Sequence, residues 1–90
     1  MKKQLSEQTI SKMKDKETYV PLHMREGYMN YFNNGIKNGG FGTAVINEDL
    51  DYAYRKADST NSQHVESQIA WVKIAKEDIE SGYRVKSVYK

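Results

Sequence analysis

The chain contains no cysteine and only one proline among its 90 residues. Without cysteine, neither a disulfide framework nor a thiolate metal site can form. No stretch approaches the roughly 18 to 20 consecutive apolar residues of a membrane span, and the segment from Met1 to Leu5 lacks the apolar core of a signal peptide. These absences predict a cytoplasmic protein with no membrane partner.

An excess of charge of either sign is also missing. Fourteen lysines and arginines face twelve aspartates and glutamates, which gives a formal net charge of +2. Dedicated duplex-binding proteins carry a clustered basic excess, so we do not expect nucleic acid to be the main partner. Accessory nucleic-acid binding stays open because five lysines gather near the N-terminus: Lys2, Lys3, Lys12, Lys14 and Lys16.

Apolar residues are scarce at 38%, yet seven of the ten aromatic residues are tyrosines. A chain of this length makes one domain with a small core, and without disulfides it is expected to gain stability by forming a homo-oligomer. Tyrosine combines a flat apolar ring with a polar tip, which suits wet interfaces and stacking on nucleotide bases. The alternative is that a small domain simply leaves its tyrosines half exposed.

The hydrophobic pattern predicts an all-α fold with three to four helices. Residues 1–18 are polar and are interpreted as an N-terminal arm or short helix, either mobile or docked on a neighbouring subunit. Residues 19–90 form a single helical domain in this interpretation. No segment alternates polar and apolar residues as a strand would.

Three helices are expected within that domain. The first spans residues 22–33 and ends at Asn34-Gly35, and the second starts at Thr43 and continues to Ala57. A polar interruption at residues 58–62 precedes the last helix, residues 63–87, which would be about 35 Å long. A helix of that length favours packing against a second copy, and hence an oligomeric helical assembly.

Signatures of catalysis are absent from the sequence. There is no nucleophile elbow and no paired-histidine zinc motif, and the only histidines are His23 and His64. Although His23 and Glu26 are spaced as half of a helical metal site, single pairs of this kind are common. We therefore expect a binding protein without a metal or cofactor, and not an enzyme.

The segment from Asn38 to Thr43 is the strongest candidate for a ligand site. Its glycines precede a predicted helix, where free backbone N–H groups and the helix dipole favour an anion. The alternative is a plain glycine-rich turn between helices. Basic and tyrosine side chains nearby complete the candidate ligand-binding set: Arg25, Tyr28, Tyr31, Gly39, Gly40, Phe41, Gly42, Thr43, Arg55 and Lys56.

The last predicted helix carries the pattern Trp71-x-x-Ile74-Ala75-x-x-x-Ile79-x-x-Gly82-Tyr83. This pattern resembles the signature in the helical hairpin of small bacteriophage sponge proteins that counter CBASS and Thoeris defence. The resemblance implies a compact helical homo-oligomer that sequesters a cyclic nucleotide signal between protomers without cleaving it. The family's Arg-Ala-Val ending is replaced here by residues 85–88, Val-Lys-Ser-Val.

Three further segments, residues 23–28, 40–45 and 49–61, resemble a family of short phage proteins, mostly uncharacterised. Together the two resemblances imply a phage immune-evasion protein that acts in the host cytoplasm by binding a cyclic dinucleotide or a related anion. The alternative function is a phage inhibitor that binds a host protein directly through an exposed aromatic surface.

Overall fold

The structure, a computed structural model, describes residues 4–87 and the side chains of residues 4–79. Every regular element in this part of the chain is helical, so the expected all-α class is confirmed. Five α-helices and two short 3-10 helices follow one another: α1 (Glu7–Ser11), η1 (Lys12–Lys14), α2 (Leu22–Asn34), α3 (Gly40–Ile46), α4 (Leu50–Lys56), η2 (Asn61–Gln63) and α5 (Val65–Ser87). Three to four helices were expected, because α1 was counted within an arm and α3 and α4 as one helix.

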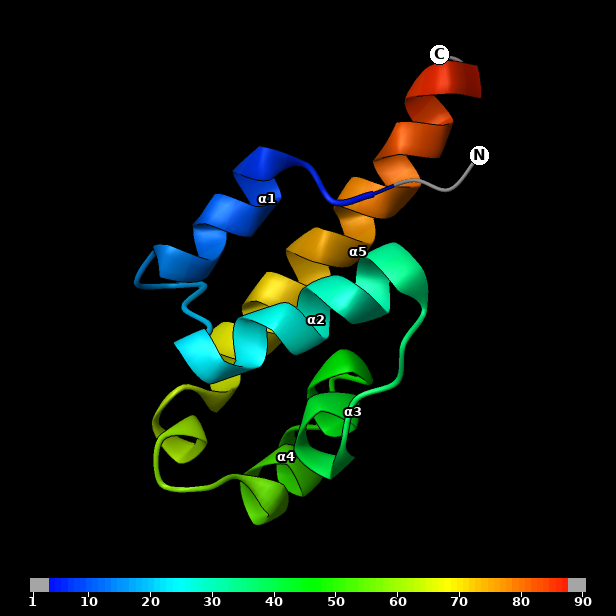
Figure 1. Cartoon of the computed structure of the whole chain (residues 1–90). Helices are drawn as coiled ribbons and strands as arrows, with labels where there is room; N and C mark the ends of the chain where they lie inside the picture. Colours follow the sequence, from blue (N-terminus) through cyan, green and yellow to red (C-terminus); the bar gives the residue numbers. More distant parts are fainter. Residues whose placement is uncertain (1–3, 88–90) are drawn as a thin grey trace.

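The long helix α5 is the axis of the molecule. Figure 1 shows α1 and α2 beside its middle and α3 and α4 near its start. The molecule measures 43 × 25 × 20 Å, and α5 continues beyond the other helices along the longest of these dimensions. Oligomerisation, which the helix length suggested, remains a proposal.

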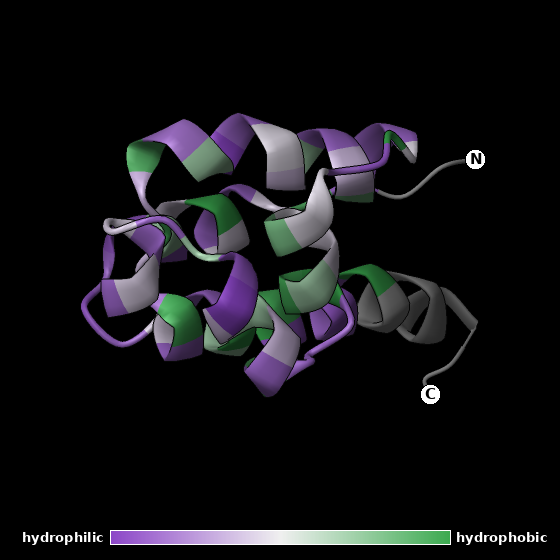
Figure 2. Ribbon diagram, turned by 90° about the horizontal axis from the view of Figure 1, so that it is seen from below, coloured by the Kyte–Doolittle hydropathy of each residue, from purple (hydrophilic) through white to green (hydrophobic). Residues whose placement is uncertain are grey.

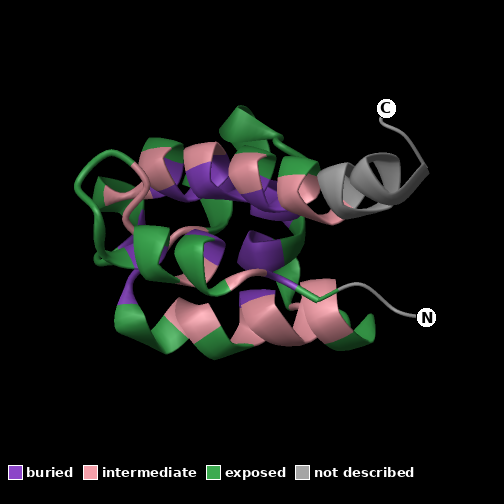
Figure 3. Ribbon diagram, turned by 90° about the horizontal axis from the view of Figure 1, so that it is seen from above, coloured by how far each residue is buried: buried purple, intermediate pink, exposed green. Residues whose placement is uncertain are grey.

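The core is formed where the inner faces of these helices meet. Each helix carries both hydrophilic and hydrophobic positions (Figure 2), and the buried positions lie on the sides that face one another (Figure 3). Trp71 occupies the centre, with its ring 5.9 Å from that of Tyr28 and 5.8 Å from that of Phe32. The largest fully buried side chains are Trp71, Tyr28, Met13, Gln68, Val20, Val45, Val65 and Val72.

Helix α2 ends as the sequence predicted. Gly35 has a φ of 73°, in the left-handed region that glycine adopts without a steric penalty. Its N–H donates to the carbonyl of Tyr31, and the N–H of Ile36 donates to the carbonyl of Asn30. These bonds satisfy the last carbonyls of α2 and turn the chain toward α3.

The predicted helix from Thr43 to Ala57 is wrong, because the chain turns sharply in its middle. Glu48 adopts a left-handed φ of 59°, and its N–H and that of Asp49 donate back to the carbonyls of Val45 and Ala44. The Asp49 carboxylate then accepts a hydrogen bond from the N–H of Tyr52, 3.2 Å away, and so caps the start of α4. Helices α3 and α4 therefore form a hairpin, and residues 57–60 separate α4 from η2.

Residues 4–18 pack against the rest of the described chain. A short helix was one of the two expectations for residues 1–18, and α1 is that helix. Leu5, Thr9 and Met13 are buried. The Trp71 indole N–H donates to the Thr9 carbonyl at 2.8 Å, so the segment docks on α5 of its own chain.

Candidate functional site

The loop between α2 and α3 is held by one side chain, that of Asn38. Its Nδ2 donates to the carbonyl of Gly27 at 3.3 Å. A Cβ added to Gly27 would lie 2.6 Å from Asn38 Oδ1, and one added to Gly42 would lie 2.7 Å from Asn38 Cβ. The two glycines therefore make room for Asn38 between α2 and α3, and this close approach explains Gly42 without any ligand.

The start of α3 is open to solvent. Gly39, Gly40 and Thr43 are exposed, whereas Phe41 and Gly42 are buried. The N–H groups of Gly40, Phe41 and Gly42 have no hydrogen-bond acceptor among the described residues. Because α3 has only seven residues, its dipole is short and adds little, so attraction for an anion depends on nearby side chains.

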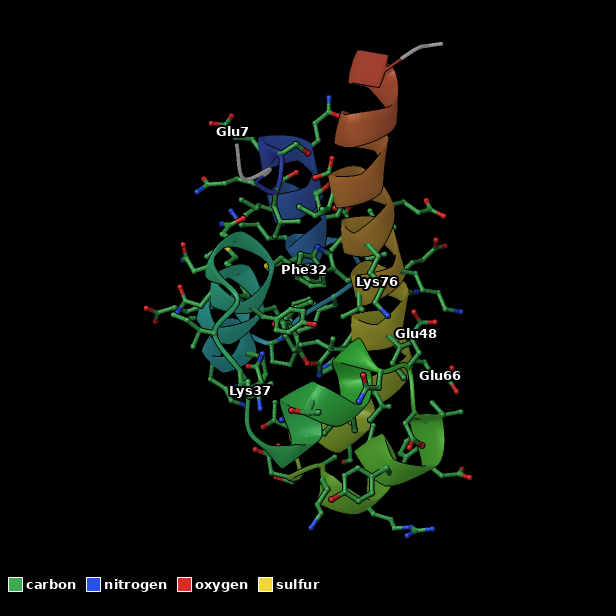
Figure 4. The ribbon with its side chains drawn as sticks, turned by 90° about the vertical axis from the view of Figure 1, so that its right-hand side faces the viewer. Glu7, Phe32, Lys37, Glu48, Glu66 and Lys76 are labelled. Carbon is green, nitrogen blue, oxygen red and sulfur yellow. The ribbon has the colours of Figure 1, made fainter. Side chains whose placement is uncertain are left out.

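A cleft of about 350 Å³ lies between the end of α2, the loop and α3. Thr43 donates its hydroxyl to the Asn38 carbonyl at 3.1 Å, and Lys37 is exposed at the same edge of the molecule (Figure 4). An ammonium, two amides and two hydroxyls line the cleft together with one aliphatic side chain: Tyr31, Lys37, Asn38, Thr43, Ile46 and Asn47. These groups can hydrogen-bond an anion and stack against a planar ring.

Two residues predicted to contact the ligand, Tyr28 and Arg25, make hydrogen bonds within the fold and do not line this cleft. Tyr28 is fully buried, its hydroxyl donates to Gln68 Oε1 at 2.6 Å, and burial raises its pKa well above the ordinary value. Tyr28 is therefore a core residue. Arg25 donates its Nε to the Val20 carbonyl at 2.8 Å and places its guanidinium 5.6 Å from the centre of the Tyr19 ring.

The two basic residues of α4 lie at different distances from the candidate site. The Lys56 side chain passes Gly40, with its Cδ 3.9 Å from where a Cβ would stand. Its Nζ lies 5.5 Å from the centre of the Tyr52 ring. Arg55 is exposed on α4 and does not line the cleft. Of the predicted set, only Tyr31 and Thr43 line the cleft itself.

Three cleft residues were missed by sequence reasoning: Lys37, Ile46 and Asn47. Asn38 begins the candidate segment but was not in the ligand-binding set. A signal for two of them was present. Lys37 is the single charged residue in the glycine- and asparagine-rich loop, and Asn47 follows Thr43 by four residues, so it comes one helical turn later on the same face.

The described part of the pattern in the last helix serves packing. Trp71 and Ala75 are fully buried, and Trp71 contacts Tyr28 and Phe32. Ile74 and Ile79 are partly exposed, and Gly82 and Tyr83 lie beyond the residues whose side chains are described. The four described residues of the pattern therefore contribute to packing around α5 and do not line the cleft.

No protein-family model, curated protein or solved structure matches this chain. Within the described residues, no helix has the length and apolar character needed to cross a bilayer. In the same part of the chain, no three histidine, aspartate or glutamate side chains are grouped as metal ligands would be.

Proposed function

We propose that this protein binds a nucleotide-type anion of the cyclic dinucleotide class in the Lys37 cleft and holds it without cleaving it. The observation that carries the proposal is the gathering of Tyr31, Lys37, Thr43 and Asn47 around one hollow beside the open start of α3. The Lys37 ammonium and the Asn47 amide can donate to a phosphate, and the Tyr31 ring matches a base.

Retention without reaction agrees with the cleft's chemistry. No carboxylate or imidazole is among the residues that line the hollow, so the lining offers no strong general base. The role is that of the phage sponge proteins that the last helix resembles, which would place the protein in the cytoplasm of an infected cell. A sponge needs only affinity and abundance.

The size of the cleft supports a ligand shared by two protomers. Its volume of about 350 Å³ is near the lower end of the range of roughly 300–1,000 Å³ for small-molecule sites. One cleft therefore suits one base with its phosphate. A cyclic dinucleotide contains two such halves, and two copies of the chain related by a two-fold axis would enclose it.

Isothermal titration against a panel of cyclic di- and trinucleotides and cyclic ADP-ribose isomers tests the proposal. We expect binding to one member, and we expect Lys37→Ala to weaken it by about 10- to 100-fold, because a charged hydrogen bond contributes about 1.5–3 kcal/mol. Lys14→Ala is the matched control, since Lys14 is an exposed lysine in η1 that does not line the cleft.

Two further measurements belong to the same experiment. Sedimentation with and without the ligand should show a change from the 10.4 kDa monomer to a dimer. Mass spectrometry of the bound material after incubation should return the nucleotide intact. No heat with any member of the panel, or equal affinities for the wild type and Lys37→Ala, would contradict the proposal.

A further inference from the structure

Helix α4 exposes more large apolar surface than any role in the core explains. Of its seven residues only Ala53 is buried. Leu50 is 42% exposed, Tyr52 41% and Tyr54 45%. Leu50 and Tyr54 are four residues apart and so lie on one face of the helix, one turn above the other.

That face of α4 borders two hollows along α5. One, of about 620 Å³, is lined by Lys16, Tyr19, Tyr54 and residues 63–67, where η2 ends and α5 begins. The other, of about 380 Å³, is lined by Leu50, Ile69, Ala70, Lys73 and the carboxylates of Glu48 and Glu66.

Glu66 lines both hollows, so they adjoin at its side chain, and we treat them together as one groove. Figure 4 shows Glu48 and Glu66 on the same side of α5, where the α3–α4 hairpin meets it. We call this the α4–α5 groove. Its floor includes Val65 and Ile69 of α5, and one wall carries Leu50 and Tyr54 of α4.

The charges around the groove have a definite order. Lys16 lies at one end and Lys73 at the other, with Glu66 where the two halves join. Lys16 and Glu66 have no ion-pair partner among the described residues, and Lys73 makes no direct ion pair there but lies close enough to Glu48 to lower the pKa of that carboxyl. Glu48, by contrast, is paired with Lys76 at 2.8 Å.

We propose that the α4–α5 groove binds an amphipathic helix of a partner protein. The apolar stripe of that helix packs on Leu50, Tyr54 and Ile69, as amphipathic helices do in hydrophobic grooves. Its two ends carry carboxylates that meet Lys16 and Lys73, and its middle carries a cation that meets Glu66. The α5 part of the lining, from Val65 to Lys73, is about 12 Å long at a rise of about 1.5 Å per residue, enough for about two turns of helix.

This interaction is separate from the proposed nucleotide binding. The groove and the Lys37 cleft share no lining residue. Variants of the groove should therefore leave the Lys37 cleft unchanged, and the two proposals can fail independently.

Selection of a helix-biased peptide library displayed on phage against the immobilised protein tests the proposal. We expect enrichment of peptides with apolar residues at helical spacing, acidic residues near both ends and a basic residue between them. The enriched peptide is then synthesised, and its affinity is measured by fluorescence anisotropy.

Matched variants locate the binding site of that peptide. Tyr54→Ala and Leu50→Ala should each weaken the affinity for the peptide by about 30-fold, the effect of removing a central anchor. Two control variants should change this affinity little. They are Tyr52→Ala, at a similarly exposed position of α4, and Leu22→Ala, at a position of α2 that is 75% exposed. Lys73→Glu should weaken binding, and a lysine in place of the facing acidic residue of the peptide should restore it.

Three outcomes would overturn the proposal. The first is a selection that enriches no sequence over background. The second is an enriched peptide that binds Tyr54→Ala and Leu50→Ala as tightly as the wild type. The third is an unliganded dimer that these variants convert to monomer in sedimentation experiments, because a second copy of the chain would then occupy the groove.

Discussion

Tyr28 was predicted to contact a ligand, but in the fold it is a fully buried core residue. Its hydroxyl begins a buried polar chain that continues from Gln68 Nε2 to Asn61 Oδ1 at 3.2 Å. The N–H of Asn61 in turn donates to the carboxylate of Asp58 at 2.7 Å. Every buried side-chain nitrogen and oxygen in the described residues has a partner. A satisfied network of this kind favours one arrangement of α2 against α5.

Tyr28→Phe should destabilise the protein by about 1–2 kcal/mol, because the fully buried amide oxygen of Gln68 loses its donor. Urea denaturation followed by circular dichroism measures the change in the free energy of unfolding. Tyr54→Phe, at a half-exposed position, serves as the control and should be near neutral. Equal stability of Tyr28→Phe and the wild type would argue against the hydrogen bond to Gln68.

The same hydroxyl predicts a pH dependence at the alkaline end. Burial raises the pKa of Tyr28 in the folded state, whereas the unfolded chain releases this proton near pH 10. Above that pH the folded state binds more protons than the unfolded state, so stability falls as pH rises, by up to about 1.4 kcal/mol per pH unit. Urea midpoints between pH 8 and 11 should bring the wild type and Tyr28→Phe together above about pH 10. Parallel curves would contradict this.

At the scale of the elements, local sequence signals were sufficient for some boundaries and insufficient for others. The end of α2 was predictable because Asn34-Gly35 is a strong stop signal. The break between α3 and α4 was not, because Glu48 occupies a left-handed position where glycine is usual. Asp49, which caps the start of α4, was the one sequence signal for the break. An aspartate on the outer face of a continuous helix looks the same in the sequence, so this signal was ambiguous.

The glycines before and within α3 show why the candidate site could be predicted only in part. Composition indicated a loop in which the backbone is accessible, and Gly39 and Gly40 fit that interpretation. Gly42 instead accommodates Asn38, a tertiary contact that no periodicity reveals. The predicted set therefore shares Tyr31 and Thr43 with the candidate cleft, leaves out Lys37 and Asn47, and includes Arg25 and Tyr28, which do not line it.

Two glycine substitutions in α3 should have opposite effects. Gly42→Ala places a methyl group against Asn38 and should destabilise the protein by about 1–3 kcal/mol. Gly40→Ala meets only the flexible Lys56 side chain at 3.9 Å, and it should be neutral or stabilise by up to about 1 kcal/mol, since alanine is the better helix former. Thermal and urea unfolding of the two variants and the wild type measure these changes in stability. Similar losses in both variants would mean that Asn38 is not wedged at Gly42.

At the scale of the whole molecule, the N-terminal segment completes the core. Leu5, Thr9 and Met13 recur every four residues and are all buried. The pattern was difficult to recognise because its middle member is a threonine, which counts as polar. The backbone of the segment is also anchored, since the N–H of Leu5 donates to Asn33 Oδ1 at 2.9 Å and the N–H of Val20 to the Met13 carbonyl at 2.9 Å.

Met13→Ala should therefore cost about 2–4 kcal/mol, as truncation of a fully buried methionine does. A mobile arm would tolerate the change. Lys14→Ala, at the exposed neighbouring position, should be close to neutral. Guanidinium unfolding of the two variants and the wild type gives the comparison, and a neutral Met13→Ala would mean that the segment is not docked.

The position of Trp71 has a practical consequence. It is the single tryptophan of the chain, it is fully buried, and it touches α2 through two rings and α1 through one carbonyl. Its fluorescence will therefore report the departure of either helix from α5 in one signal. Its indole lines neither the Lys37 cleft nor the α4–α5 groove. A change in tryptophan emission during a ligand titration would therefore indicate unfolding and not occupancy of either site.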